Sequence, residues 1–141
     1  MSMDEDRRLR YRDNIFWIRN RADLITSWTG KVCPEDLISD TRTVLAVFKA
    51  FQEISEAFMD LVAMYLRDNR IPPRDDYDNI ERIDLFSSSQ KQLLRGMNGL
   101  RNRIIHRYNG TDELLALSGI LGSVPDILRL VQVIEEWIEK P

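Results

Sequence analysis

The sequence predicts an all-α protein, an up-and-down helical bundle in a single domain over residues 1–141. Apolar residues recur every three or four positions along several long segments, the spacing that lines one face of an α-helix. No segment alternates apolar and polar residues with a period of two, so we expect no β-sheet. Glycine and proline are few, 6 and 5 residues, and they act mainly as breaks between helical segments.

The first helix is expected over residues 6–28. Ile15, Ile18, Ala22 and Ile25 recur there at helical spacing, which predicts one buried face. The pair Thr29-Gly30 follows the last apolar position, and glycine is the residue that most readily ends a helix.

The second helix is expected over residues 35–67. Pro34 is tolerated at a helix start because the first N–H groups have no partner within the helix, and Glu35 and Asp36 favour its positive end. At 1.5 Å per residue this helix would be about 50 Å long. The run Ile71-Pro72-Pro73 ends it. We predict that it packs antiparallel to the helix over 6–28 and that these two dominate the bundle.

Shorter elements are expected in the rest of the chain. Residues 75–86 are predicted as a loop with a short helix. Ser87 to Ser89 offer caps for a helix that reaches Tyr108, with Asn109-Gly110 as its C-terminal cap. A short helical segment is expected from Thr111. The run Ser123-Val124-Pro125-Asp126 is predicted to open the last helix, with serine as the cap and proline in the first turn.

Composition favours a location in the cytoplasm. Cys33 is the only cysteine, so the chain cannot form an internal disulfide, which fits a reducing compartment. Residues 1–12 are charged and lack the apolar stretch of a secretory signal. We see no apolar run near the roughly 20 residues that span a bilayer, so no membrane association is expected.

Positive charge is concentrated in one segment although the net charge is −3. No acidic residue lies between Asp84 and Asp112, and arginine suits phosphate recognition better than lysine does. On charge alone, arginines that solvate helix faces are the simpler explanation. The cations of this segment are Lys91, Arg95, Arg101, Arg103 and Arg107.

The segment also holds the only histidine of the chain, His106, with Arg101 five positions before it and Tyr108 two positions after it. A lone histidine is more often a surface or satisfied residue than a catalytic one. Helical geometry at about 100° per residue places two sets of residues on opposite faces. The apolar set is Leu93, Met97, Leu100, Ile104 and Tyr108, and the polar set is Arg95, Asn98, Asn102, His106 and Asn109.

Two features of this helix are unusual. Arg101 falls on the apolar face, where a buried arginine needs a partner unless its side chain turns toward a cleft. Gly96 and Gly99 are poor helix formers, and their presence suggests the close approach of another backbone or of a substrate.

The pattern Arg101, four residues, His106, one residue, Tyr108 resembles the signature of the HepT-type toxins, a branch of the HEPN superfamily. The long second helix, the break at residues 71–73 and Pro125-Asp126 before the last helix are also similar. The resemblance extends from about residue 5 to residue 138. It implies a HEPN-like fold with two long antiparallel helices and shorter C-terminal helices.

The resemblance implies a metal-independent endoribonuclease that works as a homodimer. It implies a toxin–antitoxin system of the type VII kind, in which a minimal nucleotidyltransferase antitoxin attaches AMP to the motif tyrosine. Arg101 and His106 then match the catalytic positions, Tyr108 the modified one, and Asn102 the polar residue that often follows the arginine. An acidic helper on the second helix is left open among Glu53, Glu56 and Asp60.

Elementary chemistry agrees with this expectation. RNA cleavage without a metal needs a base for the 2′-hydroxyl proton, an acid for the leaving 5′-oxygen and a cation for the phosphorane. One chain has a single histidine, whereas a two-fold dimer with residues 90–110 at its interface would supply two. Supporting RNA contacts are expected from Asn102, Arg95, Asn98, Arg103 and Arg107.

The sequence indicates no metal site and no cofactor. It has one histidine and one cysteine, without carboxylates spaced as a ligand set near them. The run Asp75-Asp76-Tyr77-Asp78 resembles a calcium loop but lacks the glycine and the distal glutamate, so we interpret it as a solvated loop.

Two other functions are weighed against the ribonuclease. The first is a non-catalytic helical module that binds a nucleotide or a nucleotidyltransferase partner without cutting RNA. The complete arginine–histidine–tyrosine set favours the enzyme over this module. The second is a purely structural bundle, which leaves the acid-free basic segment unexplained.

Overall fold

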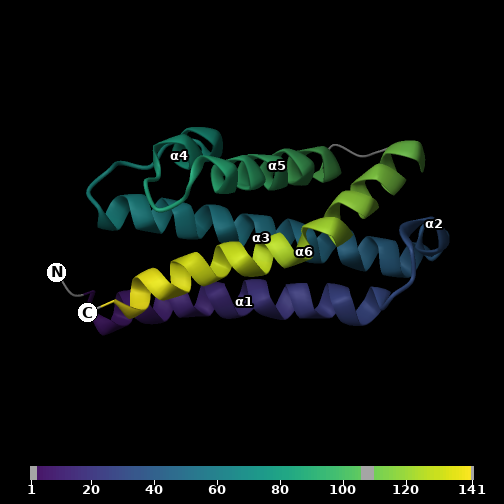
Figure 1. Ribbon diagram of the computed structural model, residues 1–141, viewed down its shortest axis with the longest axis horizontal. Coiled ribbons are helices and arrows are strands. Elements are labelled where there is room, and N and C mark those ends of the chain that lie inside the picture. Colours follow the sequence, from purple (N-terminus) through teal and green to yellow (C-terminus); the bar gives the residue numbers. More distant parts are fainter. Residues whose placement is uncertain (1–2, 106–109, 141) are drawn as a thin grey trace.

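The computed structural model describes residues 3–105 and 110–140. Its elements are α1 (Glu5–Thr29), α2 (Pro34–Leu37), α3 (Thr41–Asp68), α4 (Asp76–Arg82), α5 (Ser88–Ile105) and α6 (Gly110–Glu139). The four long helices α1, α3, α5 and α6 run alternately up and down, with α1 and α3 antiparallel (Figure 1). No strand occurs in these two ranges. The predicted all-α, up-and-down architecture is therefore confirmed.

Helix α1 has clear signals at both ends. The Asp4 side chain accepts a hydrogen bond from the backbone N–H of Arg7 at 2.9 Å, which satisfies one of the free donors of the first turn. Gly30 follows the last turn with φ at 55°, a conformation that favours glycine. The bounds agree closely with the prediction of 6–28.

The predicted continuous helix over 35–67 is wrong at its start. Pro34 opens only the four-residue α2, and α3 begins separately at Thr41. Asp40 produces this new start, because its side chain accepts hydrogen bonds from the Thr43 backbone N–H at 3.2 Å and from Thr43 Oγ1 at 2.7 Å. From Thr41 to Asp68 the helix is long and unbroken, as predicted.

The prediction that Ser123 to Asp126 opens a separate helix is also wrong. Helix α6 is continuous from Gly110 to Glu139, with Pro125 inside it. Proline has no N–H for the carbonyl one turn earlier and crowds that carbonyl, so it bends a helix, and Figure 1 shows α6 bent near its middle. Ser123 caps nothing here, because its Oγ donates backwards to the Ile120 carbonyl at 2.7 Å.

The stretch Glu113–Glu139 of α6 is long and apolar enough to cross a membrane, by length and composition only. This differs from the expectation that no such stretch exists. One such helix is weak evidence, because core helices of soluble proteins pass the same test. In this fold α6 places Leu117, Ile120, Ile127, Leu130, Val131, Ile134 and Ile138 in the core.

A polar and aromatic cluster joins α1, α3 and α6 near the end of α3. Tyr11 Oη donates to Asp68 Oδ2 at 2.6 Å, and Arg7 Nη2 donates to Asp68 Oδ1 at 2.8 Å. The Trp137 ring of α6 lies with its centroid 5.4 Å from that of Tyr11 and 4.6 Å from that of Tyr65. Burial, and then the bond to Asp68, raises the pKa of Tyr11 far above its usual range. The phenol is therefore a permanent donor to Asp68.

The Tyr11 hydroxyl is expected to stabilise the fold measurably. Tyr11→Phe keeps the buried ring but removes the donor to a carboxylate, a bond of the class worth about 2 kcal/mol. The free energy of unfolding, measured by urea titration, should fall by about that amount. Tyr77→Phe is the control: its ring is exposed, its hydroxyl makes no such bond to the residues that the structure describes, and stability should be unchanged. Equal stability of the two variants would show that the Tyr11–Asp68 bond contributes nothing.

Candidate active site

Helix α5 turns one face toward α3 and α4 and another toward α6. Leu94, Met97 and Asn98 are buried, at 0%, 5% and 1% exposure, and Arg101 continues this series one turn later. These positions follow the i, i+3, i+4, i+7 pattern of one helix face. Arg101 therefore lies on the inward side of α5, as the sequence predicted, and it needs a partner there.

The Arg101 guanidinium is held by one residue of its own helix and one of α3. Nη1 donates to Asn102 Oδ1 at 2.8 Å, and Nη2 lies 3.5 Å from Glu56 Oε1. The Arg101 side chain is 23% exposed and that of Glu56 44%. The Arg101 Nε is buried and has no hydrogen-bond partner in the part of the chain that the structure describes. The cation is thus positioned, but its hydrogen-bonding capacity is only partly used.

The structure distinguishes the three candidate acids of the second helix. Glu56 is the one beside Arg101, and it also accepts a hydrogen bond from Gln52 Nε2 at 3.1 Å. Glu53 instead faces α1, where it lies 3.4 Å from Arg21 Nε. Asp60 lines a different surface cavity with residues of α1. Desolvation and the nearby carboxylates of Asp76 and Glu56 raise the pKa of Asp60.

The predicted supporting residues are not all on one exposed face. Arg103 is exposed, and Arg95 forms an ion pair with Glu81. Asn98 contradicts the predicted polar face: its side chain is buried, and its Oδ1 lacks a hydrogen-bond partner among the described residues. The reason is that α5 packs on two sides, so the inward face is shifted by one residue from the predicted stripe. An RNA contact from Asn98 is not supported by this placement.

The remaining residues of the motif, His106, Arg107 and Tyr108, lie outside the described residues, as does Asn109. Their positions in the chain follow directly on the last turn of α5. The dimer predicted through residues 90–110 stays a prediction.

The two glycines of α5 have different surroundings. A Cβ on Gly99 would lie 3.4 Å from Tyr77 Oη of α4, which is a tight contact. The expected close approach is thus made by a side chain. A Cβ on Gly96 would meet nothing within 4 Å. Gly96 instead borders open space between α5 and α6.

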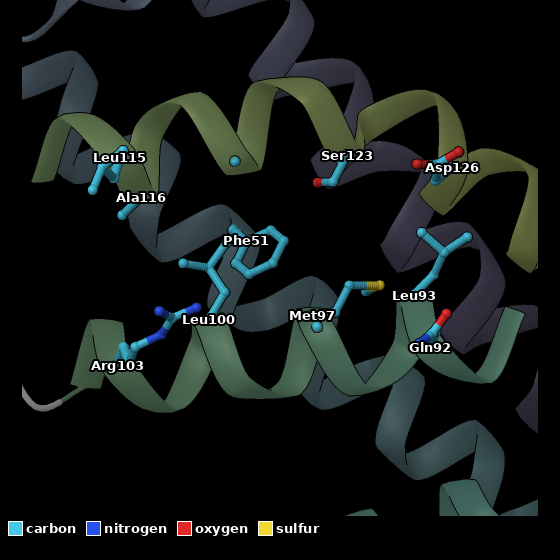
Figure 2. A pocket seen from close by; sticks show the side chains of 12 residues that line it. Phe51, Gln92, Leu93, Met97, Leu100, Arg103, Leu115, Ala116, Ser123 and Asp126 are labelled. Carbon is cyan, nitrogen blue, oxygen red and sulfur yellow. The ribbon is translucent and has the colours of Figure 1, made fainter. Parts of the chain in front are cut away.

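That space is a cavity of about 380 Å³, which was not predicted from the sequence (Figure 2). Figure 2 shows Leu93, Met97, Leu100 and Arg103 on α5 facing Leu115, Ala116, Ser123 and Asp126 on α6, with Phe51 of α3 behind them. Gly96 and Gly119 were the available signal, because glycines in facing helices leave room between them.

Within residues 3–105 and 110–140 no group of three or more histidine, cysteine or carboxylate side chains is placed to hold a metal. Asp75, in the run that resembles a calcium loop, instead caps α4 by accepting from the Asp78 backbone N–H at 2.9 Å.

Sequence comparisons relate this chain to known ribonuclease families. The family model described as Ribonuclease HepT-like matches residues 18–134. Two proteins of Archaeoglobus fulgidus, each named "Putative RNase", are 34% identical to the chain. One match covers 69% of this chain and 76% of the relative, and the other covers 75% and 76%.

Structure comparisons find the same fold in two solved toxin structures. One is the tri-AMPylated HEPN toxin of Shewanella oneidensis in complex with MNT antitoxin, with a TM-score of 0.81 and 19% identity over 95% of this chain and 99% of that one. The other is the toxin–antitoxin MntA-HpeT with a tyrosine-to-alanine mutation, with a TM-score of 0.79 and 19% identity over 90% and 98%. At this identity the likeness establishes the HEPN-like helical fold alone.

Arg101 is expected to lower the stability of the fold it belongs to. Its Nε is buried without a partner among residues 3–105 and 110–140, and its ion pair with Glu56 is long, so leucine at this inward position should pack better. Arg101→Leu should raise the free energy of unfolding by about 1 kcal/mol, measured by urea titration. Arg42→Leu, at an exposed position of α3, is the control and should change little. A clear loss of stability in Arg101→Leu would identify the arginine as a structural residue.

Proposed function

Because the chain belongs to the HepT-like ribonuclease family, we propose that it is a metal-independent endoribonuclease, the toxin of a toxin–antitoxin pair. The observation that carries this proposal is Arg101, a half-buried guanidinium with unused hydrogen-bonding capacity, five positions before the only histidine of the chain. An arginine held by one distant carboxylate keeps donors for a phosphate, which supports a functional role. RNA is the substrate, and we place the reaction in the cytoplasm.

The proposed reaction begins when a base removes the 2′-hydroxyl proton, so that O2′ attacks the adjacent phosphorus. The bond from phosphorus to the 5′-oxygen breaks, and an acid returns a proton to that oxygen. The products are a 2′,3′-cyclic phosphate and a 5′-hydroxyl. Arg101 stabilises the negative charge of the phosphorane, and His106 serves as base or acid.

A dimer supplies what one chain lacks. Acid and base are needed together, and each chain has one histidine. We therefore propose a two-fold homodimer in which residues 90–110 of the two chains meet and both His106 side chains serve one site. The exposed Arg103, together with Asn102, Arg95 and Arg107, binds flanking phosphates. To bind a phosphate, Arg95 must first break its ion pair with Glu81.

The partner is a minimal nucleotidyltransferase antitoxin that transfers AMP to Tyr108. The phenol oxygen bonds to the α-phosphorus of ATP, its proton passes to a base of the partner, and pyrophosphate leaves. The related Shewanella toxin is AMPylated in complex with an MNT antitoxin, which supports this assignment. The added phosphodiester competes with RNA for Arg101 and obstructs the approach to His106.

His106→Ala is expected to abolish most cleavage. Removal of a general acid or base costs about 10²- to 10⁴-fold in rate, so cleavage of a fluorescent RNA should fall by about 10³-fold. Wild-type activity should survive EDTA and leave 2′,3′-cyclic phosphate ends, detected by mass spectrometry. Light scattering should report a dimer for both proteins. Arg70→Gln is the control and should cleave normally. Full activity of His106→Ala, or a wild-type monomer that cleaves RNA, contradicts the proposed mechanism.

Tyr108→Phe separates the toxicity of the protein from its neutralisation by the antitoxin. The variant keeps the aromatic ring but lacks the acceptor oxygen, so it should remain toxic while co-expressed antitoxin no longer restores growth. Mass spectrometry should find AMP on the wild-type peptide that contains Tyr108 and none on the variant. The switch assignment is wrong if antitoxin rescues the variant fully and the wild-type peptide carries no AMP.

A further inference from the structure

The cavity between α5 and α6 has apolar walls and polar groups at its two ends. Phe51 and Met97, at 0% and 5% exposure, form its base. Leu93 and Leu115 are 39% and 69% exposed at its rim. At about 380 Å³ it falls within the range of sites for small molecules. Such a space can take a flat apolar group of the size of a heterocyclic base.

Its opening follows from the sequence of the two helices. Gly96 on α5 has no atom within 4 Å of a built Cβ, and a Cβ on Gly119 of α6 would only touch Leu100 at 3.5 Å. Both glycines line the cavity. Since a larger side chain at Gly96 would fit without a clash and would favour the helix, the space is not forced by packing.

One end of the cavity is cationic. Arg103 lies two residues after Arg101, is exposed, and forms no ion pair within the described ranges. Figure 2 shows its guanidinium directed into the space between the helices, near Leu100. An arginine in this situation is a ready partner for a phosphate.

The other end is rich in hydrogen-bond acceptors. Asp126 and Ser123 of α6 lie there opposite Gln92 of α5 (Figure 2). Ser123 Oγ already donates to Ile120, so it offers its lone pairs to the cavity. Asp126 also pairs with Arg129, but a carboxylate has two oxygens and accepts several bonds.

From these contacts we infer that the cavity is a base-binding subsite of the RNA substrate and that it selects guanine. This inference rests on the proposed ribonuclease function and specifies its substrate. Guanine presents two adjacent N–H donors, N1 and N2, on its Watson–Crick edge, which match a carboxylate acceptor. Adenine, cytosine and uracil each present an acceptor beside their single donor position, so they meet Asp126 less well.

The position of the subsite links specificity to cleavage. Arg103 would hold a phosphate of the guanine nucleotide at the cavity mouth, one turn or less from Arg101 on the same helix. The base would lie between apolar side chains, as unstacked bases do in single-stranded RNA recognition. A guanine seated there places its neighbouring phosphodiester toward the end of α5.

Binding of 5′-GMP to the purified full chain tests the subsite without any cleavage step. Isothermal titration should give a Kd at least tenfold lower for 5′-GMP than for AMP or CMP. Gly96→Leu fills the cavity and should weaken 5′-GMP binding at least tenfold. Gly122→Leu is the matched control, because a Cβ at Gly122 of α6 also meets nothing within 4 Å and this residue does not line the cavity. It should bind 5′-GMP like the wild type.

Two further variants separate the ends of the cavity. Asp126→Asn should remove the preference for 5′-GMP over AMP. Arg103→Gln should weaken 5′-GMP at least fivefold yet leave guanosine unaffected. Circular dichroism confirms that each variant is folded.

Sequencing of cleavage products distinguishes RNA from a free nucleotide as the occupant. Wild type should cut next to guanine, and Gly96→Leu should lose this preference. The subsite would be overturned by cleavage without any guanine preference or by tighter binding of AMP than of GMP. A change of oligomeric state in Gly96→Leu would also overturn it, because the cavity would then bind a second copy of the chain. Cleavage that proceeds while 5′-GMP fails to bind overturns the subsite alone. Tight 5′-GMP binding without any cleavage overturns the ribonuclease and with it the RNA source.

Discussion

Every other long helix of the bundle packs against α3, and this constraint shapes the rest of the molecule. Helices α1, α4, α5 and α6 all contact it, so it is apolar around most of its circumference. Three of its acids are paired with an arginine from a different helix, and Asp68 is paired with Arg7 of α1. Glu53 lies by Arg21 of α1, and Glu56 by Arg101 of α5. The arginine of the candidate site is therefore held by the same helix that organises the core.

Side-chain hydrogen bonds to α3 are concentrated near its C-terminal end. Near the end of α3, Asp68 accepts from Arg7 and Tyr11, and Tyr65 Oη donates to Asp84 at 2.7 Å. Burial and this last bond raise the pKa of Tyr65 to about 12. These bonds are shorter than the 3.5 Å contact between Arg101 and Glu56, although the Nε atoms of both Arg7 and Arg101 are buried without a partner among the described residues.

Elements whose ends are set by one local signal were predictable, and those where two signals compete were not. Helix α1 follows its apolar period and its glycine end. The start of α3 depended on Asp40 capturing Thr43, and nothing in the apolar pattern signals that a cap at residue 40 outweighs Pro34. The pattern around Pro125 fits a helix start and a bent helix equally well. The structure has the bent helix, with Leu117 and Ile127 both buried in the core.

The same reasoning applies to the site. The sequence identified Arg101 as an arginine on an apolar face that needs a partner, and geometry then selected Glu56 from three acids. Asn98 was misplaced because a single apolar stripe was assumed for α5, whereas this helix packs against α3 and α4 on one side and α6 on the other. The cavity was not predicted for a related reason, since Gly96 and Gly119 signal reduced side-chain volume but leave a common space only where α5 and α6 pack together.

The start of α1 and the end of α6 lie side by side, joined by the Arg12–Glu139 ion pair at 2.8 Å, at the opposite end of the bundle from the last turn of α5 (Figure 1). Two helix ends that lie so close together suit circular permutation. A short peptide could join them and new ends could be opened in the turn between α1 and α2, with every helix contact kept. A reporter domain joined before α1 or after α6 would lie at the opposite end of the bundle from the last turn of α5, so the protein can be immobilised or labelled away from its candidate site.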